Sequence, residues 1–295
     1  MSASSVAVIE LETDTDYWKV SGPNGDFGQE GAELDQNPKG LYSTGFTTRT
    51  VSGAYQIGGR AVGEEIPIRQ LTLPFNLFDV GAGVEDVLSR FRKTWRRGRT
   101  VTWKYTSAIS GTRWLKVRVA QQLEVSPKRD WNLDGYCRVV VTAIALQPMY
   151  ESDPDSVSWS NPSVGSHTGW LPLWNPTSED MWLEWSFDPA TSWSFPDFSF
   201  GNERRWRRAA GVDADRMIVT PGLTSKLSVM AHPDYETYLA EDLSNAAGLF
   251  NGLEPMYWVP AYTDPIEVPV VCNGPAGATV TMTMQRRWDA ESGLE

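Results

Sequence analysis

The sequence of 295 residues contains few of the side chains on which most enzyme chemistry depends, with 2 histidines and 2 cysteines. A base-activated nucleophile, a redox pair or a zinc site needs such residues in close sets. His167 lies in a Ser- and Gly-rich stretch, and His232 precedes Asp234 and Glu236 without a second cluster of ligands. The glycine-rich motifs of nucleotide-binding proteins are also absent. We therefore expect no metal, no cofactor and no histidine-based catalysis.

The two cysteines give no indication of redox chemistry. Cys137 and Cys272 are far apart in the chain, and the domain boundary argued below places them in different domains. We expect both to be small buried residues in strands rather than partners in a disulfide or a metal site.

Long apolar runs are missing as well. No segment approaches the roughly 18 consecutive apolar residues that a membrane helix needs. The first residues, MSASSVAVIELETD, have neither the cationic start nor the apolar run of a signal peptide. We expect a protein that is made in a cytoplasm and does not insert into a membrane.

Positive charge is in deficit, with 26 Lys and Arg against 37 Asp and Glu, a formal net charge of -11. The long-range field of such a chain repels a polyanion, so we expect no specific binding of nucleic acid. One stretch runs against this balance, because FRKTWRRGRTVTWKY, from Phe91 to Tyr105, alternates cations with aromatic residues. Its charge must therefore serve a local purpose.

The basic run begins within a predicted helix that ends at Gly98. One apolar face is formed by Val84, Val87, Leu88, Phe91 and Trp95. The cations lie off this face near the C-terminal end, where the helix dipole favours them. They are Arg90, Arg92, Lys93, Arg96 and Arg97. They can form a solvated face, contact a partner or line a channel.

The length and the pattern of strands predict two domains that are mostly β, with one clear helix. Period-two segments between residues 6 and 148 form the first domain, and Pro67 and Pro74 place the strand from Glu65 to Phe75 at an edge or beside bulges. The stretch Ser21 to Gly40 reads as a loop. A Ser- and Pro-rich linker, ESDPDSVSWSNPSVGSHTGW, sets the boundary near residue 152, giving domains 1–152 and 153–295. Short strands in the second domain suggest a sandwich.

The 14 tryptophans leave two binding or catalytic alternatives open. Exposed indole rings stack on sugars or anchor protein partners, although burial in a thin β core is the simpler interpretation. A glycoside hydrolase would need two carboxylates at a fixed separation. The acidic residues available near these tryptophans are Glu179, Asp180, Glu184, Asp188 and Asp197.

The order of these segments resembles the distal tail proteins of long-tailed bacteriophages, often called minor tail proteins in phages of actinobacteria. The segments that carry the resemblance are RQLTLPFNLF, RFRKTWRRG, TVTWKY, GTRWLKVRV, ALQPMYES, NPTSEDMWLEW and the closing VPAYTDPIEVPVVCNGPAGATVTMTMQRRW. They span most of the chain. The loop from Ser21 to Gly40 matches no element of that family.

The resemblance implies a non-enzymatic virion protein that is assembled in the host cytoplasm. Such a protein has an N-terminal split β-barrel domain that forms a ring, usually a hexamer, and a C-terminal galectin-like β-sandwich. Its partners would be other copies of itself, the tail tube protein, a tail-tip hub or tail-associated protein, and the tape measure protein. In a ring, Arg92, Arg96, Arg97 and Arg99 would contact the acidic surface of the next subunit. A carbohydrate-binding module and a tail-associated hydrolase are the competing interpretations.

Overall fold

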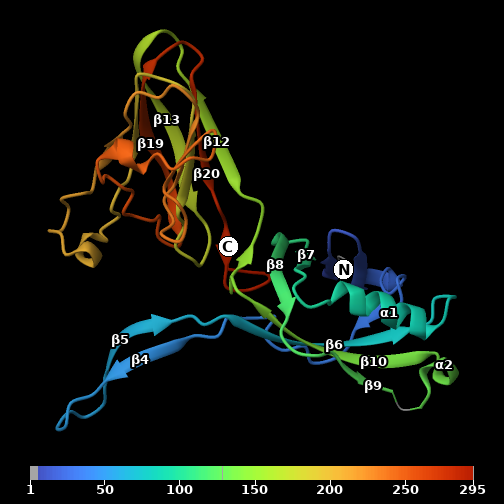
Figure 1. The fold of residues 1–295 in the computed structure, drawn as a ribbon. Coiled ribbons are helices and arrows are strands. Elements are labelled where there is room, and N and C mark those ends of the chain that lie inside the picture. The colour runs from blue at the N-terminus through green and yellow to red at the C-terminus, as the bar shows by residue number, and fades with distance from the viewer. Residues whose placement is uncertain (1–5, 128, 295) are drawn as a thin grey trace, which may run out of the picture. The chain divides into compact units, whose positions relative to one another are not determined.

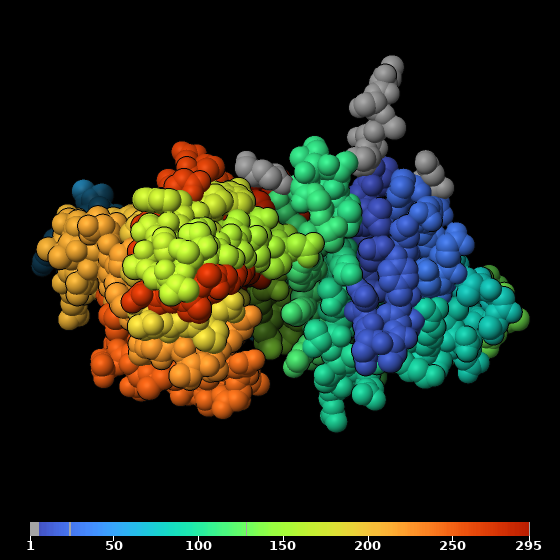
Figure 2. Space-filling view, turned by 90° about the horizontal axis from the view of Figure 1, so that it is seen from above, coloured from blue at the N-terminus to red at the C-terminus, as the bar shows by residue number. Residues whose placement is uncertain are grey.

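The computed structural model describes residues 6–127 and 129–294 and divides the chain into two compact units (Figures 1 and 2). The first unit holds the residues up to Ser152 together with Trp288–Leu294, and the second holds Asp153–Arg287. The sequence analysis places Trp288–Leu294 in the second domain, whereas in the structure this segment packs with the first. Residues 1–5 of the N-terminal segment lie outside the described residues.

The first unit is built on one ten-stranded antiparallel sheet. Its main order is β2-β1-β7-β8-β10-β6-β3, and the strands at its two ends, β2 and β3, lie against each other, so the sheet nearly closes into a barrel. The strands of this order are β1 (Val8–Glu12), β2 (Tyr17–Ser21), β3 (Ala32–Leu34), β6 (Arg69–Phe78), β7 (Val101–Ser107), β8 (Gly111–Val119) and β10 (Tyr136–Ala145). The short strands β9 (Glu124–Ser126), β11 (Tyr150–Glu151) and β21 (Arg287–Trp288) pair beside it.

The structure differs from the predicted strand Glu65–Phe75 at both Pro67 and Pro74. Strand β6 starts at Arg69, and Ile66 and Ile68, expected on its buried face, are each 46% exposed. Pro74 lies between two strands rather than at an edge, with β10 on one side and β3 on the other. Its carbonyl accepts a bond from Asp35 on the β3 side. Because the N–H and C=O of a strand residue point the same way, the missing proline N–H removes no bond to β10.

Helix α1 (Val84–Thr94) covers the core of the first unit with the predicted apolar face. It ends at Thr94, four residues before the predicted end at Gly98, and Trp95 forms its C-cap. The ring of Phe91 meets Trp18 and Phe75 edge-on, with centroids 5.4 and 5.1 Å away. Trp95 also turns inward and is 2% exposed, and the chain leaves the helix at this residue. Arg96 and Arg97 therefore belong to a turn after the helix.

Two elements of the first unit are absent from the sequence prediction. Strands β4 (Thr47–Val51) and β5 (Arg60–Glu65) form a separate two-stranded hairpin, drawn in blue in Figure 1. A helical turn, α2 (Trp131–Asp134), lies within a predicted loop. The stretch from Ser21 to Gly40 contains the turn η1 (Pro23–Gly25) and strand β3, so it is partly built into the sheet.

The second unit is a β-sandwich in which two antiparallel sheets enclose one core. The first sheet has the order β12-β20-β14-β17-β18, with β12 (Asp155–Ser160), β20 (Thr279–Met284), β14 (Leu183–Phe187), β17 (Leu227–Met230) and β18 (Tyr238–Ala240). The second has the order β13-β19-β15-β16, with β13 (Gly165–Asn175), β19 (Thr263–Gly274), β15 (Ser192–Pro196) and β16 (Met217–Val219). Short turns η2 (Glu203–Trp206) and η3 (Ala247–Phe250) complete it. The expected mostly-β fold is confirmed.

The predicted linker is wrong, because it forms strands β12 and β13. On β12, hydroxyl side chains alternate with larger residues and pair with threonines of β20. Three such pairs have oxygens 2.8 to 3.0 Å apart: Ser156–Thr283, Ser158–Thr281 and Ser160–Thr279. This ladder has the composition of a loop but the periodicity of a strand.

The segment that returns to the first unit is held by two buried arginines. Arg69 is 3% exposed and donates from Nη2 to the carbonyl of Asp289 at 2.8 Å. Arg113 is fully buried and donates from Nη1 to the carbonyl of Ala290 at 3.0 Å. The guanidinium of Arg113 also lies 3.7 Å from the centroid of the Trp288 ring. These contacts place the segment within the structure of the first unit.

Candidate interaction surfaces

The basic turn after α1 presents three of the four predicted contact residues to solvent. Arg92, on the last turn of the helix, and Arg96 and Arg97, just after it, are exposed. Trp95, between them in the sequence, is buried. The local packing therefore holds the indole inward while the cations remain accessible.

Arg99 occupies a different environment from the other three. Its Nη2 lies 2.7 Å from Oδ1 of Asp14 and 2.8 Å from Oγ1 of Thr15, and its side chain is 18% exposed. Arg90 is likewise used within the unit, since its Nε donates to Asp16 at 2.9 Å. These two arginines neutralise the acidic turn between β1 and β2. Arg92, Lys93, Arg96 and Arg97 are exposed, and their charges are available for another molecule.

The β4–β5 hairpin is exposed along its whole length, because every residue of both strands is on the surface. Tyr55 and Ile57 at its tip are as exposed as in an extended chain, at 102% and 103%. Phe46 and Val51 are 66% and 55% exposed. The β-branched residues from Thr47 onward favour a strand, and the Gly58–Gly59 pair favours a turn. Neither strand, however, has a buried face. The sequence of the hairpin therefore lacks the alternation of apolar and polar residues from which a strand is predicted.

A second basic segment lies in the second unit, in the loop between β15 and β16. It reads ERRWRR, and Arg204, Arg205, Trp206 and Arg207 are exposed. No apolar periodicity surrounds this segment, so the sequence pattern does not predict it. The signal that could have found it is its likeness to the TWRRG of the first basic run.

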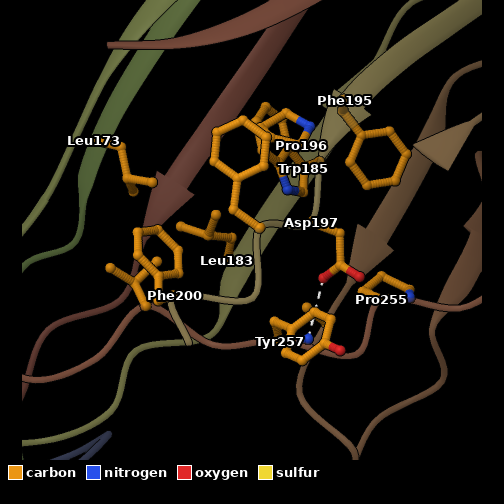
Figure 3. A pocket seen from close by; sticks show the side chains of 12 residues that line it. Leu173, Leu183, Trp185, Phe195, Pro196, Asp197, Phe200, Pro255 and Tyr257 are labelled. Carbon is orange, nitrogen blue, oxygen red and sulfur yellow. Dashed lines mark hydrogen bonds between the residues drawn. The ribbon is translucent and has the colours of Figure 1, made fainter. Parts of the chain in front are cut away.

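The apolar cavity of the second unit is too small for a substrate. It measures about 20 Å³, which is room for roughly one water molecule. Figure 3 shows its lining, with Asp197 beside Tyr257 and Pro255, and with Leu173 on the opposite side. Asp197 forms an ion pair with Arg216 and accepts bonds from the backbone N–H groups of Met256 and Tyr257. This carboxylate is therefore occupied in the fold, and a sugar has no space beside it.

The two histidines also have structural roles. His167, near the start of β13, bridges Asn161 and Ser163 of the preceding turn at 2.9 and 3.1 Å. His232 is packed between Trp182 and Tyr235, and burial lowers its pKa.

The cysteines behave as small core residues. Cys137 and Cys272 are buried and free, and burial raises the pKa of each thiol. Within residues 6–127 and 129–294, no group of three or more His, Cys, Asp or Glu could hold a metal ion. No helix in the same part of the chain is long and apolar enough to cross a membrane.

Of the 14 tryptophans, seven are buried, five are half-buried and two are exposed. Trp18, Trp95, Trp103 and Trp193 are among the most deeply buried side chains. In the second unit, Trp170 is 59% exposed on the outer face of β13, and Trp206 is 45% exposed.

Comparison with known proteins places the chain among phage tail proteins. No protein-family model matches it. It is 24% identical over 285 residues to the minor tail protein Gp27 of Mycobacterium phage D29, covering 81% of this chain and 84% of that protein. It is 25% identical over 296 residues to the Gp27 protein of Mycobacterium phage L5, covering 82% and 84%.

The fold has matching solved structures. The Dit protein of phage SPP1, described as a paradigm of the hub adsorption apparatus in phages that infect Gram-positive bacteria, superposes with a TM-score of 0.62 and 12% identity. That match covers 95% of this chain and 99% of the other. A chain of the phage P2 baseplate superposes with a TM-score of 0.53 and 12% identity, covering 97% and 99%.

These relatives are structural components of virions, as the sequence analysis expected of this chain, and they support a non-enzymatic role. The predicted resemblance is confirmed: the chain is a structural tail protein of a bacteriophage, related in sequence to mycobacteriophage minor tail proteins and built on the fold of distal tail proteins.

Proposed function

We propose that the chain assembles into a ring at the tip of the phage tail and that its first unit forms this ring. The observation that carries the proposal is the β4–β5 hairpin. Isolated two-stranded hairpins are at best marginally stable in water, and this one exposes Phe46, Val51, Tyr55 and Ile57. A hairpin with free backbone edges and exposed apolar side chains is suited to pairing with another molecule. A neighbouring copy in a ring would supply that surface at every position.

The charges of the first unit support a contact between copies. Arg92, Arg96 and Arg97 are exposed at the C-terminal end of α1, and Glu85 and Asp86 are exposed in its first turn. Two different and complementary patches on one subunit give a head-to-tail contact, which closes into a ring when the rotation permits. Cations lining the channel are the alternative. They would retard DNA that must pass freely, so we favour the contact between subunits.

A ring of this kind would join the tail tube to the tail-tip complex, and we expect six copies from the family resemblance. Its partners would be the tail tube protein on one side and a tail-tip hub or tail-associated protein on the other, with the tape measure protein reaching it from the tube. The matches to SPP1 Dit and to a chain of the P2 baseplate support this placement.

The test is the assembly state of the full chain. Light scattering gives the mass in solution, and negative-stain electron microscopy gives the shape. Rings of uniform size that bind purified tail tubes at one end would support the proposal. A monomer at all concentrations, or a closed dimer without a central opening, would contradict it.

A carbohydrate-binding role is the second candidate, and the exposure of Trp170 favours it. Its indole lies on the open face of β13 opposite Pro269 of β19, with the hydroxyl of Thr168 on the same face. Flat aromatic rings beside hydroxyl groups bind sugar rings. A glycan array with the full chain and with Trp170→Ala distinguishes this role, because only binding that the substitution removes would support it.

A further inference from the structure

The loop between β15 and β16 concentrates positive charge in an acidic unit. Residues 153–287 contain 17 Asp and Glu and only 8 Lys and Arg, and four of those eight are Arg204, Arg205, Arg207 and Arg208. The loop projects from the sandwich with the short turn η2 at its end, seen in gold in Figure 1. Four like charges in one short loop repel each other, so their clustering is unfavourable unless a contact compensates it.

A buried carboxylate holds the first half of the loop in one shape. Glu203 is 1% exposed and accepts a hydrogen bond from Oγ of Ser199 at 2.7 Å and from the backbone N–H of Gly211 at 2.8 Å. The bond from Ser199 is the main cause of a lowered pKa for Glu203. This single side chain ties both ends of the basic segment together.

A second buried carboxylate holds the other half. Asp213 is 4% exposed and accepts from Nη2 of Arg208 at 2.8 Å and from the hydroxyl of Tyr257 at 2.5 Å. Burying a charged group is unfavourable unless it is fully paired, and such groups fix a conformation more than they add stability. Arg208 is therefore a structural residue of the loop, whereas the cations before it are not.

The fixed loop displays the other cations around an exposed indole. The guanidinium carbon of Arg205 lies 4.5 Å from the centroid of the Trp258 ring, which orients that side chain. Among the described residues, Arg204 and Arg207 have no ion-pair partner. Arg207 has φ of 57°, a conformation that few arginines adopt. Trp206 stands between them with 45% of its surface exposed.

We propose that this loop is a docking surface for an acidic segment of another protein, with Arg204 and Arg207 pairing with carboxylates and Trp206 entering an apolar recess. Arginine and tryptophan are the residues most enriched among those that dominate binding between proteins. A loop already fixed in its bound shape loses little conformational freedom on binding. This contact goes beyond the proposed ring and does not require it.

The charge of the whole unit favours a protein over a long polyanion. A nucleic acid or an anionic polysaccharide would extend past the loop and meet the 17 acidic residues of the unit. A folded protein presents its acidic groups locally, and repulsion beyond about 10 Å is screened at physiological salt. An acidic protein segment of a few residues therefore fits the loop best.

The experiment places a photo-crosslinking amino acid at position 206 of the full chain, produced together with other tail proteins of the same phage. The same amino acid at Leu249, which is 60% exposed on η3, is the control for position. We expect a cross-link from position 206 to an acidic peptide of another protein. Adding R204E and R207E should lower its yield by about tenfold or more, because like charges then face each other. Changing acidic residues of that peptide to lysine should restore it.

Other outcomes overturn the proposal. These are cross-links to nucleic acid, to polysaccharide or to a second copy of the chain, an absence of cross-links, or a yield unchanged by R204E and R207E. Far-ultraviolet circular dichroism checks that the variants fold. R96E and R97E form a matched pair in the first unit and should leave this cross-link intact. The mass of the oligomer, measured on the same samples, separates failure of the docking surface from failure of the ring.

Discussion

The tripeptide Trp-Arg-Arg occurs twice in this protein, and the two copies have opposite environments. Trp95 of the first copy is 2% exposed, and Trp206 of the second is 45% exposed. Trp95 comes four residues after Phe91 and continues an apolar stripe that already faces the core. Trp206 lies in a short turn preceded by Glu203, Arg204 and Arg205, so no apolar stripe carries it inward. The residues that flank the tripeptide, rather than the tripeptide itself, therefore determine whether its tryptophan is buried or exposed.

Removing each indole in turn should give the largest difference between the two segments. Trp95→Ala should lower the free energy of unfolding of the first unit by roughly 3–5 kcal/mol, because a large buried side chain leaves a cavity. Trp206→Ala should change stability by no more than about 0.5 kcal/mol, because the ring is on the surface. Urea unfolding followed by circular dichroism measures both. Equal losses would mean that Trp206 is as integral to its unit as Trp95.

A smaller effect should follow from Asp213→Asn, which removes the charge that pairs with Arg208. The fold of the sandwich should persist while the loop loosens, since Asp213 joins Arg208 to Tyr257. Faster trypsin cleavage after the arginines of the loop, identified by mass spectrometry, is the expected result. Asp215→Asn, at an exposed position two residues away, is the matched control. Cleavage that the two variants accelerate equally would show that Asp213 does not fix the loop.

The two basic segments should also differ in their response to acid. The pKa of Asp213 is lowered by its bonds to Arg208 and Tyr257, and that of Glu203 by its bond to Ser199. Groups whose pKa is lower in the folded state contribute full stability above the ordinary carboxyl pKa of about 4 and lose it as the pH falls through the lower value. Hydrogen exchange, corrected for intrinsic rates, should therefore show the loop opening below about pH 4. The last turn of α1, where Phe91 and Trp95 pack in the core, should stay protected.

The smallest effect on folding should come from R96E together with R97E. Both side chains are exposed, so stability should change by about 0.5 kcal/mol or less. If these arginines contact a neighbouring copy, the reversed charges should dissociate the oligomer while the circular dichroism spectrum is retained. R204E with R207E is the control, since it alters the other segment. An oligomer as large as the parent would leave the first basic segment as a solvated face or a channel lining.

The first segment could be predicted from sequence further than the second, for a physical reason. The stripe from Val84 to Phe91 repeats every three or four residues, so its buried face could be predicted before the structure was known. The shape of the loop around Trp206 depends on Ser199, Gly211 and Tyr257, whose contacts with the acidic residues only the fold creates.

In both units, the amino-acid composition gives a wrong prediction of where strands lie. The alternating serines of β12 resembled a linker because hydroxyl groups suit turns and hydrogen-bonded ladders equally well. The β4–β5 hairpin could not be predicted from burial because neither of its faces is buried. Exposed strands lack the apolar alternation from which strands are inferred.

The return of Trp288–Leu294 to the first unit affects the order of events during synthesis. Arg69 and Arg113 are made early, but the carbonyl groups of Asp289 and Ala290 that they bind follow only after Asp153–Arg287 has been translated. At about 5–20 residues per second, that interval is roughly 7 to 27 seconds. Until then two guanidinium groups of the first unit await their partners. If assembly requires a complete first unit, only chains in which the second unit has already been synthesised can assemble.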